Sequence, residues 1–309
     1  MSSLSESLSL LPSPRRVGAV ASVTLTQLIR MRLFVVLAIF FVGFLGLQFL
    51  PFHAQMGAEF AGVSQLELMK DIGSGCMYLF GLIFAVAATS LLIPRDVEDR
   101  ILYTILCKPV PRLDYLLGKA LGVLSLLFIM ALLMDGMICA ALYFREASLA
   151  AELQQSLSER GYAAEEISLY LQQLHEVAMG WDFQLSLIPM VLSWVVLTSM
   201  TLLLSCITSG TLVSMILSLG FFFVGLFQGQ FFAALSASTG AVGTSPALQQ
   251  ISQVTAVLLP DFSLFAVGDA AMASTPISGS SLLMLGAIAG AYFIFHLLLA
   301  SYLFSKQEC

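Results

Sequence analysis

Long, uninterrupted apolar runs constrain this sequence more than any other feature. A helix rises about 1.5 Å per residue and a bilayer's hydrocarbon core is about 30 Å thick, so a run near 20 residues can span it. The runs are continuous and do not alternate with polar residues, which excludes an outer-membrane barrel. We therefore expect an all-α polytopic membrane protein with six transmembrane helices, at residues 33–50, 72–93, 120–144, 183–207, 211–235 and 280–304.

The distribution of lysine and arginine sets the expected orientation, because positive side chains are retained on the cytoplasmic side. If both termini are cytoplasmic, only Lys70, Arg145 and Arg160 of the thirteen basic residues lie outside. We therefore predict a multi-pass protein of the cell (inner) membrane with both termini in the cytoplasm. The net charge of −6 argues against nucleic acid as a partner.

The N-terminal part of the chain contains two predicted segments before the first span. Residues 1–14 are rich in Ser, Leu and Pro and predict a disordered cytoplasmic tail, and residues 305–309 form a second short tail. Residues 15–32 predict an interfacial amphipathic helix, since arginines flank an apolar face with helical spacing. That face consists of Val17, Ala21, Leu25, Leu28 and Ile29.

Two longer segments are predicted to face outward. Residues 145–182 read as an acidic helical hairpin that turns near Gly161. An ordinary solvated hairpin and a contact for a substrate or for an outer accessory protein both fit its negative surface. Residues 236–279 are too polar to span the bilayer and too apolar for a free loop, which favours a re-entrant or surface-lying segment.

A dense patch of mixed charge forms the predicted cytoplasmic loop 94–119. Within it, five apolar residues fall on one helical face and predict a short amphipathic helix over 95–107. Pro109 and Pro111 each remove a backbone donor, so this helix should end near Cys107 and the next should open at Pro111. A plain loop that only obeys the charge rule is the simpler alternative. The apolar residues are Val97, Ile101, Leu102, Ile105 and Leu106.

The order of residues in this loop is informative. An acidic pair closes the second span, followed by a Thr- and Leu-rich helix, a Lys-Pro-Val-x-Arg turn and a Leu-Gly-Lys entry into the third span. This order resembles the corresponding loop of ABC-2-type transporter permeases, although Asp96 stands where that family usually has Glu. The basic surface helix, the six spans and a Leu-Pro-Asp-Phe turn before the last span match as well. The matching loop positions are Asp96 and Glu98, Thr104 to Leu106, Lys108 to Arg112, and Leu117 to Lys119.

The resemblance implies a coupling helix that seats in a separate ABC ATPase subunit. The implied function is the permease subunit of an ATP-driven exporter, working in the lipid bilayer as a homodimer or paired with another permease. Gly286/Gly290 and Gly225/Gly229 are candidate subunit contacts. The residues expected to face the ATPase are Arg95, Asp96, Glu98, Asp99, Arg100, Thr104, Lys108 and Arg112.

No nucleotide or catalytic site is expected in this chain. Gly118-Lys119 lacks a Gly five positions earlier and is followed by Ala120, so it is not a P-loop. ATP and Mg²⁺ are therefore expected through the partner subunit. The five cysteines are scattered, which favours neither a disulfide framework nor a metal cluster, and the histidines do not form a catalytic set.

Asp135 is an isolated acid inside the third predicted span. A charged side chain there is costly, so it must be neutral, paired or wetted. It is a candidate for lining the translocation path, and a hydrogen-bonded packing residue is the alternative. Two other functions remain open: a non-transporting scaffold or mechanotransmission subunit paired with an ATPase, and a proton-coupled carrier that uses Asp135.

Overall fold

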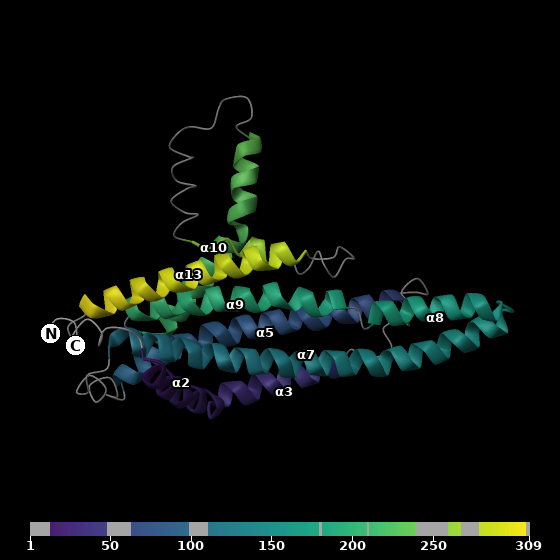
Figure 1. Cartoon of the computed structure of the whole chain (residues 1–309), viewed down its shortest axis with the longest axis horizontal. Coiled ribbons are helices and arrows are strands. Elements are labelled where there is room, and N and C mark those ends of the chain that lie inside the picture. The colour runs from purple at the N-terminus through teal and green to yellow at the C-terminus, as the bar shows by residue number, and fades with distance from the viewer. Residues whose placement is uncertain are drawn as a thin grey trace.

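The computed structural model describes residues 13–47, 63–98, 111–178, 181–208, 210–238, 259–266 and 278–306 (Figure 1). These residues are almost entirely helical, which confirms the predicted all-α class for this part of the chain. The helices are α2 (Pro14–Ile29), α3 (Arg32–Leu47), α5 (Val63–Glu98), α7 (Arg112–Glu159), α8 (Ala164–Ala178), α9 (Trp181–Ile207), α10 (Thr211–Ser238), the 3₁₀ helix η2 (Phe262–Ala266) and α13 (Gly279–Lys306).

Five of these helices are long and apolar enough to cross a membrane: α5, α7, α9, α10 and α13. They overlap five of the six predicted spans, but α5 begins at Val63 rather than at residue 72, and α7 extends on both sides of the predicted 120–144. The first predicted span, 33–50, is helical as α3, whose 16 described residues end at Leu47. Residues 48–50 lie outside the described part of the chain, so the predicted count of six remains a prediction.

Four helices run side by side along the long axis and form the core of the molecule: α5, α7, α9 and α13 (Figure 1). Small residues let them approach closely. A Cβ added at Gly81 of α5 would lie 2.0 Å from the ring of Trp194 on α9, so this fully buried indole occupies space that only glycine leaves free. Between α9 and α13, the buried Ser199 hydroxyl lies 3.0 Å from Nδ1 of His296.

Helix α2 packs along the start of α7. A Cβ at Gly118 or Gly122 of α7 would lie 2.6 Å from the Cβ atoms of Val20 or Thr24 on α2. These glycines are four residues apart and share one face of α7, the spacing that lets two helices approach closely in a membrane protein. The predicted apolar face of α2 is therefore used against α7 at Val17 and Leu28.

Helix α2 differs from the predicted helix over 15–32 in where it ends and in which residues it buries. Helix α2 stops at Ile29, and α3 begins at Arg32 after a short break. Ile29 belongs to the predicted apolar face but is 46% exposed, whereas Thr24, outside that face, is fully buried. Thr24 is buried because it packs against Gly122 of α7. The sequence of α2 alone does not show which of its residues meet α7.

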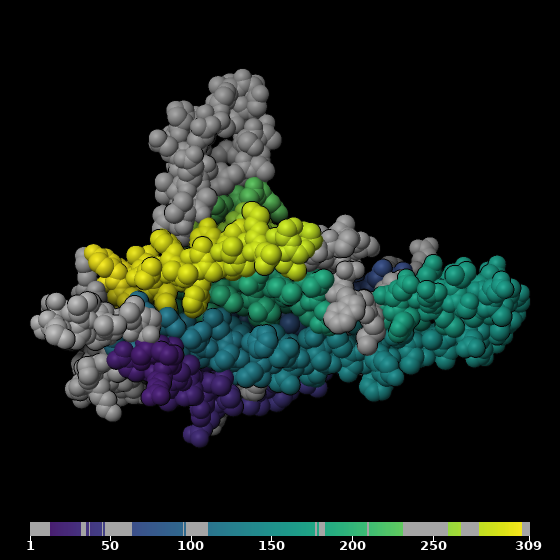
Figure 2. Space-filling model, viewed as in Figure 1, coloured from purple at the N-terminus to yellow at the C-terminus, as the bar shows by residue number. Residues whose placement is uncertain are grey.

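Helix α7 continues without a break from the predicted third span into the predicted outer hairpin. It has 48 residues, which corresponds to a rod of about 72 Å. The chain then turns at Gly161, whose φ of +79° is the left-handed conformation that glycine adopts most easily. Helix α8 returns against α7, and Nδ1 of His175 lies 2.7 Å from Oε1 of Glu146. The paired helices project beyond the rest of the molecule (Figure 2).

Helix α10 follows α9 in the chain and leaves the four-helix core at a steep angle (Figure 1). Its glycine pair, Gly225/Gly229, faces the turn that leads into η2. A Cβ at Gly225 would lie 2.4 Å from the carbonyl oxygen of Pro260, and the rings of Phe222 and Phe262 are 4.9 Å apart. These two glycines were candidate subunit contacts, and in the structure they pack against residues of their own chain. Apart from η2 and its flanking residues, most of the predicted re-entrant segment lies outside the described residues.

Candidate functional site

A group of charged and aromatic side chains joins the helix ends that flank residues 99–110. We call this group the ionic junction. It lies at the end of α5 and the beginning of α7, and it also reaches α2 and the last turn of α13. Its members are Arg16, Asp96, Arg112, Asp114, Tyr115, Lys119 and Phe304.

The centre of the ionic junction is a buried ion pair between α5 and α7. Nζ of Lys119 lies 2.7 Å from Oδ2 of Asp96, and these side chains are only 5% and 1% exposed. The hydroxyl of Tyr115, one turn earlier on α7, donates a hydrogen bond to the same carboxylate oxygen. Tyr115 and Lys119 are four residues apart and therefore share one face of α7. Together they fix the last turn of α5 to the first two turns of α7.

A second ion pair ties α2 to the same end of α7. Oδ2 of the fully buried Asp114 lies 2.8 Å from Nε of Arg16, and the Ser13 backbone N–H donates to the same oxygen at 3.5 Å. Asp114 lies in the first turn of α7, where the partial positive charge of a helix N-terminus stabilises a carboxylate. Ser13 caps α2 by accepting a hydrogen bond from the Arg16 backbone N–H.

The last turn of α13 completes the ionic junction. A guanidinium N–H of Arg112 donates to the Phe304 carbonyl oxygen at 2.8 Å, which satisfies one of the free carbonyls at a helix C-terminus. The rings of Phe304 and Tyr115 stack with centroids 6.3 Å apart. The ends of α2, α5, α7 and α13 are thus connected through side chains of α7.

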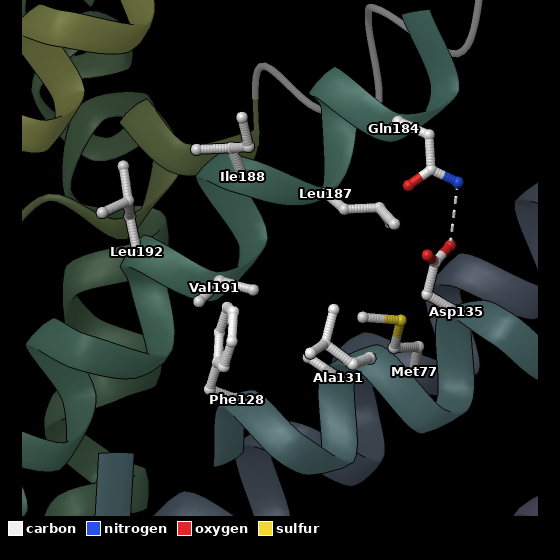
Figure 3. Close-up of a pocket in the computed structure, with 10 residues that line it drawn as sticks. Met77, Phe128, Ala131, Asp135, Gln184, Leu187, Ile188, Val191 and Leu192 are labelled. Carbon is white, nitrogen blue, oxygen red and sulfur yellow. Dashed lines mark hydrogen bonds between the residues drawn. The ribbon is translucent and has the colours of Figure 1, made fainter. Parts of the chain in front are cut away.

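A second feature is a groove between α7 and α9 that contains Asp135 (Figure 3). Its volume is about 260 Å³, and nearly all of its lining is apolar. Nε2 of Gln184, on α9, donates to Oδ1 of Asp135 at 3.1 Å and to Sγ of Cys139 at 3.2 Å. The predicted intramembrane acid therefore has a hydrogen-bond partner on the neighbouring helix and also lines an open groove.

Comparison with known proteins identifies the family. A profile described as ABC-2 family transporter protein matches residues 19–309, nearly the whole chain. The chain belongs to this family. A comparison with curated proteins finds no match. Membership of the ABC-2 family identifies the chain as a multi-pass membrane subunit of an ABC transporter, and such subunits carry no nucleotide site of their own.

In this ABC-2 family chain, both residues of the Gly-Lys pair contact other parts of the same chain. Gly118 is closed off by Val20 of α2, and the Lys119 ammonium group is buried in its ion pair with Asp96. The lysine is thus engaged within its own chain, and Gly118 lies inside helix α7. Among the described residues, no group of His, Cys, Asp and Glu side chains is placed to hold a metal ion.

The residues predicted to face the ATPase fall into three groups. Asp96 and Arg112 belong to the ionic junction and contact their own chain. Arg95 and Glu98 lie in the last turns of α5, which continues through Pro94 to Glu98. Their side chains are outside the described part of the structure, as are all of Asp99, Arg100, Thr104 and Lys108. A role for any of these residues in docking an ATPase remains a prediction.

Sequence reasoning did not identify Arg16, Asp114, Tyr115 and Lys119 as members of one cluster. A signal was present, since Asp114 and Lys119 are charged residues at the start of a long apolar helix and such residues need partners. The identity of each partner depends on how the helices are rotated, which the spacing alone does not determine.

Proposed function

We propose that this ABC-2 family chain is the transmembrane permease subunit of an ATP-driven exporter. A separate ATPase subunit docks on the cytoplasmic segment 95–107 and supplies ATP and Mg²⁺. The observation that carries this proposal is the ionic junction, because it joins the end of α5, which contains the first residues of that segment, to the start of α7, which follows it in the chain.

The ionic junction gives a route for movement into the membrane domain. A force applied to residues 95–107 acts on the end of α5 and the start of α7. Because Asp96 is tied to Lys119 and Tyr115, these two helices move together and do not slide past each other. Arg16 and Arg112 extend the same constraint to α2 and α13. The junction thus converts docking at one segment into a shift of four helices.

Pairing with a second copy, or with another permease, completes the proposed transporter. Gly286 and Gly290 lie four residues apart on α13, and a Cβ at either would meet no described atom within 4 Å. This open small-residue face suits close contact with a helix of a second subunit. We place the homodimer contact there rather than at Gly225/Gly229.

The test is ATP-driven transport in vesicles that contain the chain together with its ATPase subunit. We expect transport to require ATP hydrolysis. The charge reversals Glu98→Lys and Arg100→Glu should weaken docking of the ATPase and so uncouple ATP hydrolysis from transport. Matched reversals on the hairpin of α7 and α8, Glu152→Lys and Arg160→Glu, should have no effect. Unchanged complex formation and transport in both docking variants would contradict the coupling assignment.

One observation favours a second function, a non-transporting mechanotransmission subunit that works with an ATPase. Helix α7 runs unbroken from the ionic junction to Glu159 and carries the projecting hairpin. A rigid rod of this kind can carry a movement at the docking end to a partner bound at the hairpin. The same vesicle assay separates the two functions, because a mechanotransmission subunit binds an outer partner in response to ATP but moves no solute or lipid.

A further inference from the structure

We infer that the groove between α7 and α9 binds an amphiphile with an ammonium headgroup, and that Asp135 receives this headgroup. This inference rests on the proposed function in one respect. If the chain is an exporter, an amphiphile of this kind is the class of substrate that it exports. The residues that carry the argument are Phe128, Leu132, Asp135, Gln184, Ile188 and Leu192.

The groove opens sideways, on the lateral surface of the helix bundle. Phe128 and Leu132 of α7 are 55% and 56% exposed, and Ile188 of α9 is 42% exposed. In a membrane, such a surface faces the lipid, so a ligand can enter sideways from the bilayer. The volume of about 260 Å³ is slightly below the range of about 300–1,000 Å³ typical of small-molecule sites. A single small amphiphile, or the part of a larger one nearest its headgroup, fits this space.

The groove is polar at one end and apolar along the rest of its length, so it matches a molecule with a polar headgroup and an apolar tail. Helices α7 and α9 run in opposite directions (Figure 1), so Asp135 and Gln184 lie at the same end of the groove and face each other (Figure 3). Phe128 is seven residues before Asp135 on α7, and Leu192 is eight residues after Gln184 on α9. The apolar part therefore extends about 10–12 Å along the helices from the polar end. The polar end points toward the predicted outer surface, which matches an amphiphile of the outer leaflet.

The charge of the groove selects the headgroup. Among the described residues that line the groove, Asp135 is the one acid and none is basic. The hydrogen bond from Gln184 orients the carboxylate. The nearest basic residue along α5, Lys70, is not part of the lining, and its Nζ lies 5.5 Å from the ring centroid of Phe183. An ammonium group that enters the groove therefore meets a positioned carboxylate and no cation among the described wall residues, which favours it over an anionic headgroup.

The test is direct binding to the full-length chain, without the ATPase, in phosphatidylcholine nanodiscs. Radiolabelled dodecylamine is the probe, dodecanol is its matched neutral control, and empty nanodiscs give the background. We expect saturable binding of dodecylamine that Asp135→Asn weakens at least tenfold, with binding of dodecanol unchanged within twofold. Ile188→Trp should fill the groove and abolish binding of both probes. Glu152→Gln, on the exposed surface of α7, is the control variant.

Several outcomes decide the inference. Absence of saturable dodecylamine binding, or equal binding by the original chain and Asp135→Asn, would overturn it. If Asp135→Asn does not fold, Ile188→Trp gives the decision, because it changes an exposed side chain; retained dodecylamine binding in that variant would overturn the inference. Competition by phosphatidylethanolamine in the nanodiscs would assign the site to a lipid amine, and its absence would assign it to a free amphiphile.

The binding assay also keeps this inference separate from the proposed function. Dodecylamine binding without ATP-driven dodecylamine transport by the complete complex would leave the site in place and contradict export of this class. ATP-driven transport of another solute without dodecylamine binding would contradict the site and leave the exporter function in place.

Discussion

At the residue scale, the buried pair of Asp96 and Lys119 is the contact on which the ionic junction depends. Both side chains are removed from water, so each charge relies on the other and on the Tyr115 hydroxyl. Such a pair adds little net stability compared with apolar residues of similar size, but removing one partner leaves an uncompensated buried charge. The pair therefore acts mainly by fixing how α5 and α7 sit against each other.

We predict that Lys119→Met destabilises the chain by about 3–5 kcal/mol, because Asp96 then remains buried without its cation. The double variant Asp96→Asn with Lys119→Met should lose clearly less than the sum of its two single variants, since neither charge is left alone. SDS-induced unfolding in mixed micelles measures both values. Arg160→Met, at an exposed position, should change stability by less than about 0.5 kcal/mol. A Lys119→Met variant as stable as this control would contradict the role of the pair.

At the element scale, close packing of α2 on α7 depends on two glycines of α7. We predict that Gly122→Ala forces α2 away from α7 and costs about 1–3 kcal/mol, because its Cβ would lie 2.6 Å from Thr24. Gly136→Ala is the matched control on the same helix, with no described atom within 4 Å of the added Cβ. It should be neutral or slightly stabilising, since alanine favours a helix more than glycine does. Unfolding in SDS compares the two, and equal effects would show that α2 does not depend on this contact.

The 3₁₀ helix η2 and the turn before it pack on Gly225 of α10 in a similar way. We predict that Gly225→Ala displaces the Pro260 turn, because the new Cβ would lie 2.4 Å from the Pro260 carbonyl oxygen. Gly220→Ala, on the same helix with open space around it, is the control. Hydrogen exchange of the amides in η2 should speed up in the first variant only. Slow exchange in both would indicate that the turn is held elsewhere.

Helix positions were largely predictable from the sequence, but helix ends were not. Apolar run length predicted five of the helices that can span a membrane. The helical hairpin over 145–182 and its turn at Gly161 were predicted, and α7, Gly161 and α8 form that hairpin. That α7 joins the third span to this hairpin without a break was not predicted, because the sequence becomes polar at Arg145. The extension of α5 through Pro94 was missed because a proline usually ends a helix. The ionic junction and the groove could not be predicted, since both depend on how separate helices are rotated against each other.

At the scale of the whole molecule, α7 links the proposed docking end to the projecting hairpin. We predict that Ala147→Pro, which breaks the backbone hydrogen bonding of α7 near the base of the hairpin, separates the two candidate functions. An exporter that takes its substrate from the membrane should keep most of its ATP-driven transport. A mechanotransmission subunit should lose the response of its outer partner to ATP. Ala147→Leu, at the same exposed position, is the control and should preserve both activities.

Co-purification of the ATPase subunit with charge-reversed chains shows directly whether the ATPase docks at residues 95–107. The compared variants are Glu98→Lys and Arg100→Glu at the docking segment, and Glu152→Lys and Arg160→Glu on the hairpin. The first two variants should retain much less ATPase per chain, because they reverse charges on the proposed docking segment, while the hairpin variants should retain as much as the original chain. Equal retention of the ATPase by all four variants would contradict docking at residues 95–107.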